Sequence, residues 1–64
     1  NPTANRIYIQ VDNIIKAALF DLMGRKVIET NQNQIDLGNL NNGSYILEVT
    51  TDNNKSQSFK IIKQ

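Results

Sequence analysis

Short runs of alternating apolar residues limit the folds open to this chain more than any other feature. In run 44–51, Tyr45, Leu47 and Val49 occupy every second position, and run 6–11 alternates in the same way. Successive side chains of a strand point to opposite faces, so this spacing is typical of strands with one buried face. We therefore predict an all-β fold.

Further runs complete a set of six predicted strands at roughly ten-residue spacing. The predicted strands are 6–11, 14–22, 26–29, 35–37, 44–51 and 57–63. A helix is the alternative for 14–22, because residues 16–19 include good helix formers. That run is short, lacks an N-cap residue and stops at Gly24, so a strand is preferred. Together these strands predict a small antiparallel β-sandwich of about six to seven short strands.

The turns and the core follow from the same pattern. Ten Asn residues fall mostly between the apolar runs, where Asn side chains bond nearby backbone and tolerate left-handed conformations. The inward positions of the runs predict the core. It comprises Ile7, Ile9, Val11, Ile15, Leu19, Val27, Ile35, Leu37, Leu40, Tyr45, Leu47, Val49, Phe59 and Ile61.

Length and composition exclude several functions. With 64 residues the chain has room for one domain, and its net charge of +1 lacks the basic excess of a nucleic-acid-binding surface. It has no Cys or His, so the commonest metal ligands and the commonest general base are missing and no cofactor is expected. The chain starts with Asn1 and lacks a signal-peptide pattern. We expect one domain over 1–64, part of a larger protein.

Three residues at or beside predicted turns are interpreted first through their structural roles. Asp21 precedes Gly24 by three residues, a spacing that favours a carboxylate accepting backbone N–H bonds in a turn. Gly43 suits a backbone angle or a close approach that a Cβ would forbid, and Asn42 before it indicates either a hairpin or a corner. Tyr45 is predicted to pack and to form a tyrosine corner with backbone upstream. Direct recognition is the alternative for Tyr45.

The last run is basic as well as apolar. Lys60 and Lys63 flank Ile61 and Ile62. Lys on a terminal strand guards a sheet edge against aggregation. The alternative is that this strand is itself a signal, which a partner recognises by adding a strand to its edge. The same edge would allow self-association.

A series of short motifs follows in order along the whole chain: Asn1-Pro2-Thr3-Ala4, Phe20-Asp21-Leu22-Met23-Gly24-Arg25-Lys26-Val27, Ile35-Asp36-Leu37, Leu40, Gly43-Ser44-Tyr45 and Phe59-Lys60-Ile61-Ile62-Lys63-Gln64. In these motifs and their order, the chain resembles the C-terminal sorting domain, type A form, of type IX (Por) secretion system cargo. Two departures are the absence of a residue, usually Pro, before Asn1 and the presence of Asn42 where Pro is frequent.

The resemblance implies an immunoglobulin-like sandwich that serves as an address label. Such a label follows its cargo domain and is recognised by the outer-membrane secretion machinery after the cargo reaches the periplasm. A sortase-like peptidase then commonly removes it, and the cargo is released or attached to the cell surface. The implied signal residues are Gly43, Tyr45, Phe59, Lys60, Ile61, Ile62 and Lys63. The implied turn residues are Pro2, Asp21 and Gly24.

Two rival functions come from other classes. A carbohydrate-binding or adhesive β-sandwich would need exposed aromatic platforms, and only Tyr8 and Phe20 are expected on outer faces. A small enzyme would need a polar cleft of at least ~300 Å³. A sandwich of this length is not expected to form one.

Overall fold

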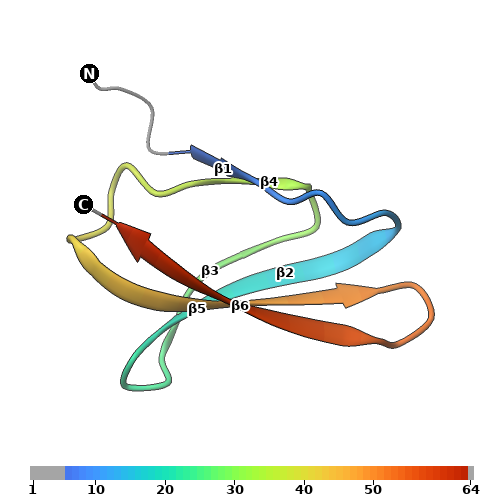
Figure 1. Cartoon of the computed structure of the whole chain (residues 1–64). Helices are drawn as coiled ribbons and strands as arrows, with labels where there is room; N and C mark the ends of the chain where they lie inside the picture. The colour runs from blue at the N-terminus through green and yellow to red at the C-terminus, as the bar shows by residue number, and fades with distance from the viewer. Residues whose placement is uncertain (1–5, 64) are drawn as a thin grey trace.

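The computed structural model describes residues 6–63, which form six antiparallel strands in two sheets. The four-stranded sheet has the order β3-β2-β5-β6, and β1 pairs with β4 in a smaller layer above it (Figure 1). The all-β class and the number of strands are confirmed, whereas the immunoglobulin-like topology stays a prediction. The strands are β1 (Arg6–Tyr8), β2 (Ile14–Asp21), β3 (Lys26–Thr30), β4 (Gln34–Asp36), β5 (Gly43–Thr51) and β6 (Ser56–Lys63).

The order of the strands decides which of them are central. β2 and β5 have a bonded neighbour on each side, whereas β3 and β6 are the edges of the four-stranded sheet. β1 is shorter than the predicted 6–11, since its ladder with β4 ends at Tyr8. The chain still runs beside the partner segment for another residue, because the Ile9 N–H donates to the Asn33 carbonyl at 2.7 Å.

The core lies between the two layers. The buried side chains that form it come from β2, β4 and β5 and from the residues that directly follow β1 or β4: Ile9, Ala17, Leu19, Ile35, Leu37, Tyr45, Leu47 and Val49. The partly buried side chains packed against them are Ile7, Val11, Ile14, Ile28, Leu40 and Ile61. All predicted core residues except Ile15, Val27 and Phe59 therefore belong to this cluster.

Two of these three errors have the same cause, a β-bulge. The ladder with β5 runs from Ile14 directly to Lys16, so Ile15 is an extra residue and its side chain is 50% exposed. On β3, the ladder with β2 passes over Val27 in the same way, and Ile28 packs against the core instead. An extra residue shifts the alternation of a strand by one position, so Ile15 and Val27 leave the core face.

The third error is Phe59, whose side chain points to the predicted face but is not covered by other side chains there. Phe59 lies directly opposite buried Leu47 and so faces the same side of the sheet. It remains 39% exposed, because among residues 6–63 β6 is an edge strand and the layer above has two strands. The inward face of β6 is therefore only partly covered.

Candidate functional site

Strand pairing gathers most of the predicted site residues at one end of the four-stranded sheet. Asp21 lies opposite Tyr45, and Tyr45 lies opposite Ile61 on its other side. Gly43 pairs with Lys63 at the same end. We call this the motif end; it lies at the left of Figure 1, where β5 begins and β6 ends. Of the other predicted residues, Gly24 lies in the turn after Asp21, and Lys60 and Ile62 lie on the half of β6 that runs to this end. Phe59 lies near the middle of β6, opposite Leu47, and Pro2 lies outside the described residues.

Asp21 organises the turn between β2 and β3. Its Oδ1 accepts the backbone N–H groups of Met23 and Arg25, both at 2.9 Å, and its Oδ2 accepts the Arg25 Nε–H at 3.0 Å. The Arg25 backbone bond is the largest of the effects that lower the pKa of the Asp21 carboxyl, ahead of the other bonds from Arg25 and Met23. The predicted turn chemistry of Asp21 is confirmed, and the carboxylate is engaged in structure.

The two glycines at this end serve backbone angles. Gly24 has a φ of +85° and Gly43 a φ of +152°, values that side chains with a Cβ rarely adopt. A Cβ at either position would meet nothing within 4 Å, so close approach is not the reason for glycine. Since β4 and β5 belong to different sheets, Asn42 and Gly43 form a corner and not a hairpin.

Tyr45 and Lys63 both hold the corner that leads into β5. The Tyr45 hydroxyl donates to the Asn41 carbonyl at 2.6 Å, which confirms the predicted bond to upstream backbone. The Lys63 ammonium donates to the Leu40 carbonyl at 2.5 Å. Each bond satisfies a carbonyl outside the ladders. Both residues thus have a structural role, and their recognition roles stay predictions.

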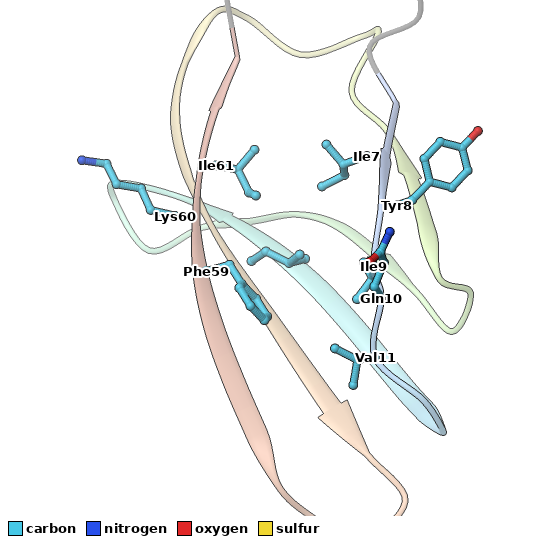
Figure 2. A pocket seen from close by; sticks show the side chains of 9 residues that line it. Ile7, Tyr8, Ile9, Gln10, Val11, Phe59, Lys60 and Ile61 are labelled. Carbon is cyan, nitrogen blue, oxygen red and sulfur yellow. The ribbon is translucent and has the colours of Figure 1, made fainter.

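A groove of about 410 Å³ separates the first strand region from β6. Figure 2 shows Phe59 and Ile61 on one side and Ile7, Ile9 and Val11 on the other, with Tyr8 pointing away. Its volume lies in the range of ligand pockets, so the size argument against a cleft is wrong. Its walls are mainly apolar, however, and among the described residues the polar side chains beside them are Tyr8, Gln10 and Lys60. The groove suits apolar contacts, and these three side chains do not form an acid–base pair.

The most exposed apolar pair of the described region was not among the predicted site residues. Leu22 and Met23, at the tip of the β2–β3 turn, are 70% and 81% exposed. Leu22 was predicted to end the strand 14–22 and Met23 to belong to the turn, and neither was predicted to contact a partner. Two large apolar side chains between a strand end and a turn glycine are the signal that could have drawn attention to them.

Comparison with known proteins identifies the family of the chain. The family model of the secretion system C-terminal sorting domain matches residues 1–64. An ulvan lyase from Nonlabens ulvanivorans is 39% identical over 69 aligned positions, which cover 97% of this chain and 13% of the lyase. The chain thus spans a small part of that relative's length, and no solved structure matches it. Because the family model covers the whole chain, the chain belongs to the C-terminal sorting domains of the Por, or type IX, secretion system.

Proposed function

We propose that residues 1–64 form one type A sorting domain, which directs a cargo on its N-terminal side across the outer membrane. A domain of this family is non-catalytic and marks its cargo for secretion or for attachment at the cell surface. In this proposal the outer-membrane secretion machinery binds the domain in the periplasm, and a sortase-like peptidase later removes it. The similarity to a much longer lyase supports a large secreted enzyme as cargo.

The position of β6 at the edge of its sheet supports the proposal that the signal lies on this strand. β6 pairs with β5 on one side and is an edge of its sheet on the other. An edge strand presents unpaired backbone N–H and C=O groups to a partner. A strand from the secretion machinery would bond to this edge, and the alternating side chains would supply selectivity.

The side chains of β6 offer contacts on both faces of that edge. Phe59 and Ile61 border the groove on the inner face. Ile62, 59% exposed, occupies the alternate position and so points to the outer face, as does Lys60. A partner strand along this edge would therefore meet apolar groups above and below the sheet, with a Lys ammonium beside them.

Truncation of the last strand tests the proposal. Residues 59–64 are deleted from a reporter that ends in this chain and is expressed in a bacterium with a type IX secretion system. We expect the reporter to remain in the periplasm, because both the free edge and its side chains are lost. Reporter in the medium at the level of the intact fusion would contradict a signal in β6.

A point variant separates recognition from folding. Ile62→Ser removes an exposed side chain, so the free energy of unfolding should change by less than about 0.5 kcal/mol, whereas the exported fraction should fall. The matched control is Gln57→Ser, an exposed position near the start of the same strand, which should leave export unchanged. Equal export by both variants would place recognition away from Ile62.

A second copy of the chain is the competing occupant of this edge. Sedimentation of the purified chain, with and without Ile62→Ser, measures that self-association. The carbohydrate-binding alternative has little support, since the Tyr8 ring points away from the groove, and family membership favours sorting over glycan binding.

A further inference from the structure

The β2–β3 turn presents two large apolar side chains to solvent. Leu22 is 70% exposed and Met23 is 81% exposed. Turn positions of this kind are usually taken by Gly, Asn, Asp, Ser or Pro, which suit the backbone and water alike. We call this pair of side chains the tip.

The backbone beneath the tip is held by several hydrogen bonds. The Gly24 N–H donates to the Asp21 carbonyl at 3.0 Å, and the Asp21 N–H donates to the Arg25 carbonyl at 2.9 Å. The Asp21 carboxylate adds the two bonds from Met23 and Arg25 already described. The conformational entropy of this loop is therefore lost on folding, and a partner that bound the tip would not need to order it again.

A second turn of the same chain shows that this backbone does not require apolar residues. In the β5–β6 turn, the Thr51 N–H donates to the Lys55 carbonyl at 2.9 Å and the Asn54 N–H donates to the Thr51 carbonyl at 3.0 Å. Asn54 takes the positive φ, +63°, that Gly24 takes in the other turn. The residues equivalent to the tip are Asp52 and Asn53. The turn geometry accepts polar residues, so the apolar tip needs another explanation.

The charges beside the tip are paired with one another. The Arg25 guanidinium binds the Asp21 carboxylate, and the Lys26 ammonium binds the Glu29 carboxylate. Insertion into an anionic membrane surface is usually aided by free cationic groups, and pairing weakens that attraction. Two apolar side chains on a rigid, locally neutral turn fit a protein pocket better than a lipid surface.

We propose that Leu22 and Met23 insert into an uncharged apolar pocket on a protein component of the secretion machinery. The tip and the end of β6 both lie at the motif end, since Asp21, Tyr45 and Ile61 are successive partners across the sheet. One partner surface can therefore contact both. This inference rests on the proposed function and adds a second contact to it.

The test replaces the tip by polar residues in the exported reporter fusion. The double substitution Leu22→Ser and Met23→Asn makes this turn polar like the β5–β6 turn. That turn has the same backbone hydrogen bonds, with Asn at the position equivalent to Met23. Burial of one such side chain corresponds to roughly tenfold or more in affinity, so we expect the exported fraction to fall at least about tenfold. The thermal midpoint of the purified chain should stay unchanged, because both side chains are exposed.

The reciprocal variant is the matched control. Asp52→Leu together with Asn53→Met creates an apolar tip on the other turn and should leave export unchanged. A normal export level for the Leu22→Ser, Met23→Asn fusion would overturn the tip proposal and leave the function of β6 standing. Failure of the unaltered fusion to leave the periplasm would overturn both.

Two binding measurements test the other possible partners of the tip, a lipid membrane and a second copy of the chain. The chain is mixed with vesicles of phosphatidylethanolamine and phosphatidylglycerol and floated, and it is separately sedimented alone. We expect no flotation and no tip-dependent change in mass. Flotation that is lost in the Leu22→Ser, Met23→Asn variant would assign the tip to a membrane. Loss of a dimer in that variant would assign it to a second copy, and either result would overturn the proposal.

Discussion

β5 and β6 are neighbours over nearly their whole length, yet their side chains meet different environments. Leu47 and Phe59 lie directly opposite each other on the same face, and they are 3% and 39% exposed, respectively. Tyr45 and Val49 on β5 are buried as well, whereas most of β6 is exposed. Two strands with similar apolar content have therefore come to serve different purposes.

The difference follows from sheet position. β5 has β2 on one side and β6 on the other, and the β1–β4 layer lies over its inner face. Within residues 6–63, β6 has a neighbouring strand on one side only. The buried strand holds the fold together, and the edge strand keeps backbone and apolar side chains available. This division supports the placement of the signal on β6.

The largest expected effect tests this division on one cross-strand pair. Leu47→Ala should lower the free energy of unfolding by about 2–5 kcal/mol, because it leaves a cavity in the core. Phe59→Ala should cost no more than about 2 kcal/mol, because the ring is already partly in water. Urea unfolding of the two variants measures the difference. Equal losses would mean that β6 is as much a part of the core as β5.

A smaller effect is expected for the two hydrogen bonds by which β5 and β6 hold the corner at 37–43. Tyr45→Phe removes the hydroxyl that bonds the Asn41 carbonyl and should cost about 1 kcal/mol. Lys63→Met removes the ammonium that bonds the Leu40 carbonyl and should cost less than about 0.5 kcal/mol, since water can replace an ammonium donor near the surface. Thermal unfolding of each variant gives the ranking. A larger loss for Lys63→Met than for Tyr45→Phe would show that the end of β6 contributes more to the stability of the corner than β5 does.

The smallest expected effect is a pH-dependent change in stability, and it compares the turn after β2 with the turn after β5. Hydrogen bonds lower the pKa of Asp21 in the folded chain, so the ionised carboxylate stabilises the fold at pH values above its unfolded pKa. That stabilisation should disappear as the pH falls below about 4 and through the lowered folded pKa. Glu29 also has a lowered pKa, caused first by its hydrogen bond from Lys26, and acts in the same direction.

Asp21→Asn isolates the contribution of Asp21 from that of Glu29. The stability gap between the unaltered chain and this variant should be present at neutral pH and should close in acid. The β5–β6 turn has Thr51 at the equivalent position and supplies no such carboxylate. A gap that did not change with pH would show that the Asp21 charge does not matter to its turn.

Prediction from sequence succeeded where the pattern is local. The alternation of 44–51 predicted which side chains of β5 are buried, and Asp21 before Gly24 predicted the turn bonds. It failed at Ile15 and Val27, because a bulge is decided by how two strands pair and leaves no trace in the alternation of either one. The exposure of Phe59 likewise depends on the width of the opposite layer.

By itself, the sequence determined the strands, the turn chemistry and membership of the sorting-domain family, since these follow from neighbouring residues and from their order along the chain. Only the tertiary structure decided that Asp21, Tyr45 and Ile61 lie side by side, that a groove opens beside β6, and that Leu22 and Met23 project from a fixed turn. The physical reason is that register and coverage arise from pairing between segments distant in sequence.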